Sequence, residues 1–228
     1  MTTFVLIPGA GGEAWFWHRL EPELGSRGHT TVAMDLPADD DSAGLAAYAD
    51  SVVAATLAAV DAASPVTVVA QSMGGLTAAL VVGRLEVEQI IMLNAMTPTP
   101  GETGGDWWAN TGQEVAAREL AAQQARDPAG SADPFELYFH DATAELISEV
   151  KGRHEAAQSG RPFADPWPLS SWPAIPTRFL AASEDRLFPL SFQRRVVSER
   201  LGIDVEPTPG GHLSALTQPA AIATLLDQ

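Results

Sequence analysis

Short, continuous runs of apolar residues recur along the chain, and longer stretches with a helical period separate them. The runs occupy residues 4–7, 30–34, 66–70, 90–93 and 177–181, with a shorter one near 204–206. Unbroken apolar runs of this length suit strands that are covered on both faces, as in a parallel sheet. The pattern therefore predicts a mostly parallel β-sheet.

Between these runs, apolar residues return at steps of three and four. One such set is Leu45, Tyr48, Val52, Val53, Thr56, Leu57 and Val60, and a later one is Phe192, Val196, Val197 and Leu201. Residues at this spacing share one face of a helix. Strands that alternate with helices over short connections form right-handed crossovers. The sequence thus predicts an α/β fold with a doubly wound sheet, in which helices follow the first, second, third and last strands and cover both faces.

The alternation stops between residues 97 and 176. This segment contains helical stretches at 113–126 and 141–158 and then a return that is rich in proline and tryptophan. Because an unstructured loop of that length is uncommon inside a compact domain, we expect a small helical cap over the carboxyl edge of the sheet. The predicted domains are a core of residues 1–96 and 177–228 and a cap of residues 97–176.

The expected cap is rich in aromatic residues, which are Trp107, Trp108, Phe135, Tyr138, Phe139, Phe163 and Trp167. A hydrophobic core within the cap accounts for most of them. Some should instead face a ligand, because pockets are largely apolar and often lie between structural units. The residues that we predict to line a substrate pocket are Gly9, Trp107, Trp108, Tyr138, Phe139, Phe163, Phe188 and Leu213.

Composition narrows the classes of partner. The chain has 228 residues and no cysteine, which excludes disulfides, thiolate metal sites and a cysteine nucleophile. Thirteen basic residues against 29 acidic ones give a formal charge of −16, which repels nucleic acids and anionic membranes, so we expect neither as a partner. The N-terminus lacks the basic region of a signal peptide, and no apolar run approaches the ~18–20 residues that span a bilayer, which favours a cytoplasmic protein.

The strongest local motif lies where the apolar run at 66–70 ends. It reads Ala70-Gln71-Ser72-Met73-Gly74-Gly75, and a helix is expected over residues 76–84. A strand that turns sharply into a helix can hold a serine at the turn with its hydroxyl exposed, and the turn requires small neighbours. Ala70 stands where the Gly-x-Ser-x-Gly pattern has its first glycine, and its methyl group is still small. A serine that only caps a helix would produce the same motif.

A serine nucleophile needs a base and a group that orients the base. Asp185 follows the predicted strand at 177–181, and His212 lies in a glycine-flanked turn after the run near 204–206. Each residue taken alone is compatible with a helix cap or a surface loop, and Glu184 competes with Asp185 for the acidic role. The order Ser72, Asp185, His212, with each residue after a strand, nevertheless favours a catalytic triad.

The first predicted strand ends in a glycine-rich turn, Pro8-Gly9-Ala10-Gly11-Gly12. Such a turn can direct backbone N–H groups towards the sheet edge, and we predict that the N–H groups of Ala10 and Met73 form an oxyanion hole. The turn matches neither the dinucleotide-binding nor the P-loop glycine pattern, and no paired histidines suggest a metal. We therefore expect neither a cofactor nor a metal.

Over nearly its whole length the chain resembles the α/β-hydrolase superfamily and, within it, the branch of small methyl esterases and hydroxynitrile lyases. The stretches that carry the resemblance are residues 4–20, the motif Gln71-Ser-Met-Gly-Gly75, Glu184-Asp185 with Phe192-Gln193, and Gly210-Gly-His-Leu213. The resemblance implies Ser72 as nucleophile, His212 as base and Asp185 as the residue that orients it. It also implies Ala10 and Met73 as oxyanion donors.

Two departures bear on the reaction that the resemblance implies. The lyase members have a threonine at the position of Gly9 and a lysine at the position of Leu213. A lyase needs a cation to hold a leaving cyanide, so these departures favour hydrolysis. The superfamily often has His-Gly after its first strand, where this chain has Pro8-Gly9.

The sequence thus predicts a serine hydrolase that cleaves a small, fairly apolar carboxylic ester or lactone through an acyl-enzyme. Two alternatives stay open. One is a lyase or cyclase on the same fold that uses His212 as a base, and the other is a weakly catalytic receptor for a small molecule. The expected partner is a small-molecule substrate, and the expected oligomeric state is a monomer or a homodimer.

Overall fold

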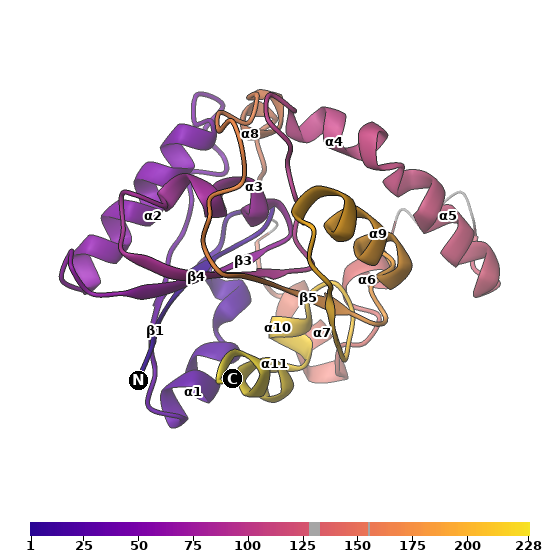
Figure 1. Ribbon diagram of the computed structural model, residues 1–228. Helices are drawn as coiled ribbons and strands as arrows, with labels where there is room; N and C mark the ends of the chain where they lie inside the picture. The colour runs from indigo at the N-terminus through magenta and orange to yellow at the C-terminus, as the bar shows by residue number, and fades with distance from the viewer. Residues whose placement is uncertain (128–132, 155) are drawn as a thin grey trace.

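The computed structural model describes residues 1–127, 133–154 and 156–228, and within them the strands form one parallel sheet of six (Figure 1). The sheet order is β2-β1-β3-β4-β5-β6. The strands are β1 (Thr3–Ile7), β2 (Thr30–Ala33), β3 (Val66–Gln71), β4 (Val87–Leu93), β5 (Thr177–Ala182) and β6 (Glu206–Thr208). Each predicted apolar run forms a strand, which confirms the α/β class and the parallel sheet.

The helices form a layer on each face of the sheet (Figure 1). Between β1 and β4 the helices are η1 (Ala14–Trp17), α1 (Leu20–Ser26), α2 (Leu45–Ala59), η2 (Ser72–Gly74), α3 (Gly75–Ala78) and η3 (Ala79–Val81). Between β4 and β5 they are α4 (Gly104–Thr111), α5 (Gln113–Gln123), α6 (Pro134–Tyr138), α7 (Ala144–Lys151) and α8 (Arg161–Ala164). The last ones are α9 (Leu190–Leu201), α10 (Ser214–Thr217) and α11 (Pro219–Leu226).

Alternate residues of the strands enter two separate hydrophobic layers. In β1, Phe4 and Leu6 pack with α1 and α11, whereas Val5 and Ile7 pack with α2, α3 and α9. β3 is buried along its whole length because it lies between β1 and β4 and is covered on both faces. This double burial explains why its sequence is a continuous apolar run rather than an alternating one.

Three predicted helices are shorter than the sequence indicated. The helical stretch expected over 113–126 forms α5, which ends at Gln123. The helix expected over residues 76–84 forms as α3 and η3 and ends at Val81, because Val82 is extended and Gly83 adopts a left-handed conformation with φ of 81°. The helix expected over 141–158 covers only α7 and ends before Gly152. In these places the chain leaves the helix to reach its next contact. The spacing of apolar residues alone does not predict where a helix ends.

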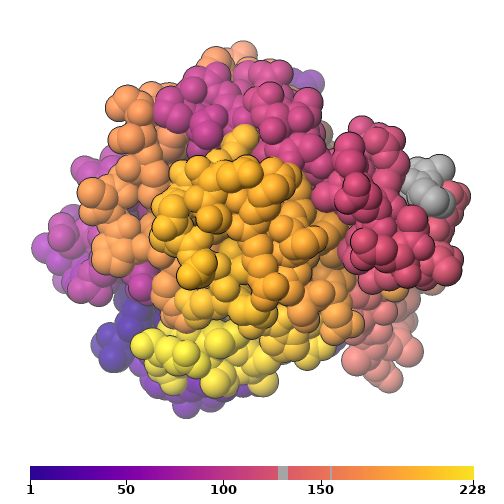
Figure 2. All heavy atoms as spheres, turned by 45° about the vertical axis from the view of Figure 1, so that its right-hand side comes forward, coloured from indigo at the N-terminus to yellow at the C-terminus, as the bar shows by residue number. Residues whose placement is uncertain are grey.

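The segment between β4 and β5 is fused to the sheet by large buried side chains. Trp107 and Trp167 belong to the same hydrophobic cluster as the strands, and the indole N–H of Trp167 donates to the carbonyl of Leu76 at 3.2 Å. Figure 2 shows α9 at the centre of one face, with α4 and α5 beside it and the C-terminal helices below. No helix in the described ranges is both long and apolar enough to cross a bilayer.

A buried ion pair joins this segment to α9. Arg200 donates to Glu102 Oε1 at 2.8 Å, and the exposed fractions of the two side chains are 11% and 3%. Burial by itself raises the pKa of Glu102, but the hydrogen bonds from Arg200 and Asn110 outweigh it and hold that pKa below its usual value. The pair therefore links the segment between β4 and β5 to α9, which packs on the sheet.

Removal of one partner of this pair should be costly. We expect Arg200→Met to lower the free energy of unfolding by about 3 kcal/mol, because the variant leaves a buried carboxylate without its cation. Arg200→Met combined with Glu102→Gln should lose less than the sum of the two single variants. Urea unfolding of the four proteins at neutral pH measures this coupling.

The ion pair between Arg200 and Glu102 also determines the direction in which the stability of the fold changes with pH. A carboxyl group with a lowered pKa in the folded state stabilises the fold fully above its unfolded-state pKa, and this contribution disappears as the pH falls through the lowered pKa. The stability difference between the wild type and Arg200→Met should therefore shrink on acidification. A difference that stays constant into the acid range would contradict the role of Glu102.

Candidate active site

Ser72 lies at the sharp turn between β3 and the following helix. Its φ is 53°, a left-handed conformation that is uncommon for a residue with a side chain. The turn is tight, because a Cβ at Gly74 would lie 2.7 Å from the carbonyl oxygen of Pro8, and one at Gly75 would collide with the carbonyl oxygen of Met96. Only glycine fits at these two positions, and the motif in the sequence reflects this close packing.

Three side chains from distant parts of the chain meet at this turn. His212 Nε2 lies 2.9 Å from Ser72 Oγ, and His212 Nδ1 lies 2.8 Å from Asp185 Oδ2. Asp185 follows β5 and His212 follows β6, so both come from the same carboxyl edge of the sheet as Ser72. The imidazole is thus placed to take the hydroxyl proton while the carboxylate accepts from its other nitrogen.

The carboxylate of Asp185 is buried and held by more than the imidazole. Its Oδ1 accepts from the backbone N–H groups of Leu187 and Phe188, each at 2.8 Å. Asp185 and His212 are each 1% exposed, and a buried carboxylate with three donors is compensated for the loss of water. Glu184, the competing acid in the sequence, is exposed.

The backbone of His212 is fixed by two amides that sequence reasoning missed as parts of the site. The carbonyl oxygen of His212 accepts from Gln71 Nε2 at 3.2 Å and from Asn94 Nδ2 at 3.0 Å. Asn94 follows β4 directly, and its Oδ1 accepts from the N–H of Ala182 at the end of β5 at 2.7 Å. An asparagine immediately after a buried strand was the signal that could have identified it.

A second contact to this loop comes from the segment between β4 and β5. Asp141 Oδ2 accepts from the N–H of Gly211 at 2.9 Å and from the hydroxyl of Thr217 at 2.6 Å. The approach is close, because a Cβ at Gly211 would lie 2.7 Å from Nε2 of His140 and 3.0 Å from Oδ1 of Asp141. Burial and the nearby charge of Arg186 lower the pKa of His140.

The glycine-rich turn after β1 approaches the serine from the other side. A Cβ at Gly9 would lie 2.9 Å from Cβ of Ser72, and the N–H of Gly11 donates to Oε1 of Gln158 at 2.9 Å. Ala10 lines the same cavity as Ser72. Met73 occupies the first turn of the helix, where backbone N–H groups have no intrahelical acceptor. The turn and the helix N-terminus thus flank the serine hydroxyl.

A cavity of about 330 Å³ opens on Ser72 and His212. Its other lining residues are Ala10, Gly11, Phe16, Gln71, Pro134, Tyr138, Phe139, Ala156, Gln158 and Leu213. Burial raises the pKa of Tyr138, as does the nearby charge of Asp185, so its hydroxyl keeps its proton at neutral pH. The lining combines an apolar surface with a few polar groups, as is usual for sites that take small molecules.

Of the predicted pocket residues, Tyr138, Phe139 and Leu213 line this cavity. Trp107, Trp108, Phe163 and Phe188 are not in its lining and pack in or against the hydrophobic core, and Gly9 faces Gln71 and Ser72. Phe188 instead supports the imidazole of His212, with the ring centroids 5.0 Å apart. Sequence reasoning missed Phe16, Pro134, Ala156 and Gln158, because the face that each short helix or loop turns inward depends on tertiary packing.

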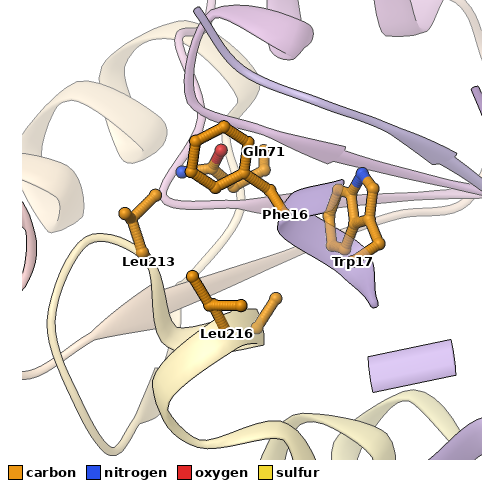
Figure 3. A pocket seen from close by; sticks show the side chains of 6 residues that line it. Phe16, Trp17, Gln71, Leu213 and Leu216 are labelled. Atoms are coloured by element: carbon orange, nitrogen blue, oxygen red, sulfur yellow. The ribbon is translucent and has the colours of Figure 1, made fainter. Parts of the chain in front are cut away.

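A much smaller pocket lies beside the cavity, against α10. There Phe16, Gln71 and Leu213 share a space of about 10 Å³ with Trp17, Ala215 and Leu216 (Figure 3). This volume is close to that of a single water molecule, so the small pocket has no room for part of a substrate. No three histidine, aspartate or glutamate side chains within 1–127, 133–154 and 156–228 lie together as a metal site.

The chain belongs to the alpha/beta hydrolase family, whose model matches residues 4–225. This match confirms the superfamily that the sequence motifs resemble. A stretch of 83 residues is 35% identical to norfluorocurarine synthase 1 from Strychnos sp., and this match covers 34% of the chain and 31% of that protein.

Two solved structures share the whole fold. Polyneuridine aldehyde esterase has a TM-score of 0.77 and 20% identity, over 100% of this chain and 98% of that one. A pyrethroid hydrolase from Sphingobium faniae JZ-2 has a TM-score of 0.74 and 21% identity, over 99% and 96% of the two chains. At these identities the likeness establishes a common fold.

The contact between Asp141 and Gly211 should affect the reactivity of Ser72. We expect Asp141→Ala to slow the labelling of Ser72 by a fluorophosphonate roughly ten-fold, about 1.4 kcal/mol in barrier, because the loop that carries His212 loses a partly buried acceptor. Asp141→Asn keeps an acceptor oxygen and should restore most of the rate. The measurement is the labelling rate at a fixed probe concentration.

Thr217→Val is the matched control, because it removes a donor to Asp141 and leaves the N–H of Gly211 paired. It should label at close to the wild-type rate. Equal rates for Asp141→Ala and the wild type would show that the contact does not position His212.

Proposed function

We propose that the protein is a serine carboxylic-ester hydrolase that cleaves a small, fairly apolar ester or lactone. The observation that carries the proposal is the continuous chain of contacts from Ser72 Oγ through His212 to Asp185, which opens on a largely apolar cavity. Hydroxyl, imidazole and carboxylate in this order are the groups needed for nucleophilic acyl transfer at neutral pH.

In the proposed reaction, Ser72 Oγ bonds to the ester carbonyl carbon while His212 Nε2 takes the hydroxyl proton. The tetrahedral intermediate collapses, the bond to the alcohol oxygen breaks, and His212 returns the proton to that oxygen. A water molecule then attacks the acyl-serine with the same base, and the carboxylic acid leaves as Ser72 regains its proton. Asp185 holds the imidazole in the tautomer that can accept at Nε2.

The negative charge that develops on the carbonyl oxygen needs fixed donors. We assign this role to the backbone N–H groups of Ala10 and Met73, which flank Ser72 from the turn after β1 and from the helix N-terminus. Preorganised donors of this kind contribute about 3 kcal/mol each to the barrier reduction. The absence of a side chain at Gly9 lets the turn approach Ser72 closely, since a Cβ there would lie 2.9 Å from the Cβ of Ser72.

The cavity supports a small substrate with an apolar body. A volume of about 330 Å³ lies at the lower end of the range for ligand pockets. Phe16, Phe139 and Leu213 provide apolar walls, and Gln158 and the protonated hydroxyl of Tyr138 provide polar contacts. The names of the two similar structures, an esterase and a pyrethroid hydrolase, accord with ester cleavage.

A second candidate function is a lyase or cyclase reaction in which His212 acts as a base without an acyl-serine. The match to a synthase, over part of the chain, favours it. Against it stands Leu213, an apolar residue that lines the cavity directly after His212 where the lyases have lysine. Hydrolysis therefore remains the better supported proposal.

Replacement of the nucleophile separates the two candidates. With p-nitrophenyl butyrate as substrate, Ser72→Ala should lower kcat by roughly 10⁴-fold or more, because no acyl-enzyme can form. A fluorophosphonate should label the wild type at Ser72 and leave the variant unlabelled. Turnover of a broader panel of esters and lactones that survives in Ser72→Ala would point to the base-only reaction.

Two adjacent acids allow a matched test of the triad. Asp185→Asn should lower kcat by roughly 10⁴-fold, because an amide favours the wrong imidazole tautomer. Glu184→Gln removes the same charge one residue earlier, at an exposed site, and should leave kcat nearly unchanged. Equal losses in the two variants would contradict the role assigned to Asp185.

A further inference from the structure

A second cavity of about 460 Å³ adjoins the one at Ser72. The two share four lining residues, which are Phe16, Pro134, Phe139 and Ala156. Because the same side chains line both, the two cavities are immediate neighbours. The pocket beside α10, of about 10 Å³, offers no comparable space.

The second cavity is basic although the protein is strongly acidic. Its lining includes Lys151, the only lysine of the chain, together with Arg153 and His154, and Glu13 is its only acidic member among the described residues. The whole chain carries a formal charge of −16. Among the described residues, the lining thus carries two permanent cations against one carboxylate, the reverse of the balance in the whole chain.

The two permanently charged basic side chains of this cavity lie against aromatic rings. The guanidinium of Arg153 lies 4.3 Å from the ring centroid of Trp15 and also pairs with Glu13 at 3.1 Å. The ammonium of Lys151 lies 5.1 Å from the ring centroid of Phe135, and within the described part of the chain it forms no ion pair. Lys151 is thus the cation that is available to an anionic ligand.

We propose that the second cavity is a subsite for a carboxylate at the far end of one arm of the substrate. The preferred substrate is then an ester with two chemically different ends. The ester group lies at Ser72, an apolar arm crosses Phe16 and Phe139, and the carboxylate reaches Lys151. The inference rests on the proposed ester hydrolysis and specifies its substrate class.

Paired esters that differ only in the distal charge test the proposal. The first series consists of monomethyl and dimethyl esters of glutarate, adipate, pimelate and suberate, in which the acyl arm carries the charge. The second consists of acetates of ω-hydroxy acids and of their methyl esters, in which the alcohol arm carries it. In at least one series, kcat/KM should favour the charged member at low salt, and the preference should fall as salt screens the contact.

Lys151→Gln should reduce this preference by up to roughly five-fold, since an exposed ion pair contributes about 0.2–1 kcal/mol. Its effect on the neutral diesters, which offer Lys151 no charge, should be smaller than its effect on the charged esters. The matched control is Arg118→Gln, which removes one positive charge from α5 at a residue outside both cavities. Glu13→Gln should act in the opposite direction, because it frees Arg153 from its carboxylate partner.

A binding measurement keeps this test separate from the proposed reaction. Calorimetry with Ser72→Ala and the same compounds, under conditions without turnover, should show tighter binding of the charged members and loss of that difference in Ser72→Ala/Lys151→Gln. If neutral esters are hydrolysed but neither series shows a preference for charge, the subsite is wrong and the hydrolase stands. If no ester is hydrolysed and Ser72 is not labelled, the hydrolase is wrong, and the binding difference alone decides the subsite.

Discussion

The left-handed turn at Ser72 is the constraint on which the rest of the site depends. A residue that continued β3 would point its side chain into one of the two hydrophobic layers, whereas φ of 53° at Ser72 points the hydroxyl out over the sheet edge. The strain is held by close packing of Gly74 and Gly75, and by the N–H of Met96, which donates to the carbonyl of Ser72 at 2.9 Å. The same turn starts η2, so the N–H of Met73 belongs to the first turn of a helix, where backbone donors have no intrahelical acceptor.

Around this turn, the other parts of the site are held by contacts between loops. His212 is buried, and its loop is fixed through the backbone by Gln71, Asn94 and Asp141, which come from three different segments. Gln71 and Asn94 together satisfy the carbonyl oxygen of His212, and Asp141 satisfies the N–H of Gly211. An imidazole held in this way keeps its distance to Ser72 and Asp185 without a contribution from the substrate. The geometry is thus present before a ligand binds.

The strands and the order of the three polar residues at their ends could be predicted from the sequence, because both depend on short patterns. An apolar run followed by Ser72 or Asp185 is visible within ten residues. Asp141 could not be found in this way, since its partner Gly211 is 70 residues away and nothing near Asp141 indicates a loop contact. Which aromatic residues line the cavity could not be predicted for a related reason. Trp107, between β4 and β5, and Phe188, after β5, are as apolar as Phe139, and only the tertiary packing decides which of them faces the core.

The segment between β4 and β5 divides into two parts with different roles. Trp107, Trp167 and Glu102 bury large side chains against the sheet layer, so that part belongs to the hydrophobic core. α6 buries none of its residues and α7 buries only Leu146, yet these helices and the loops beside them carry Tyr138, Phe139 and Lys151. Substitutions in the second part can therefore change the walls of the cavities at little cost to the fold. Asp141 lies between α6 and α7 and binds the His212 loop, so one carboxylate joins the segment that carries part of the cavity wall to the loop that carries His212.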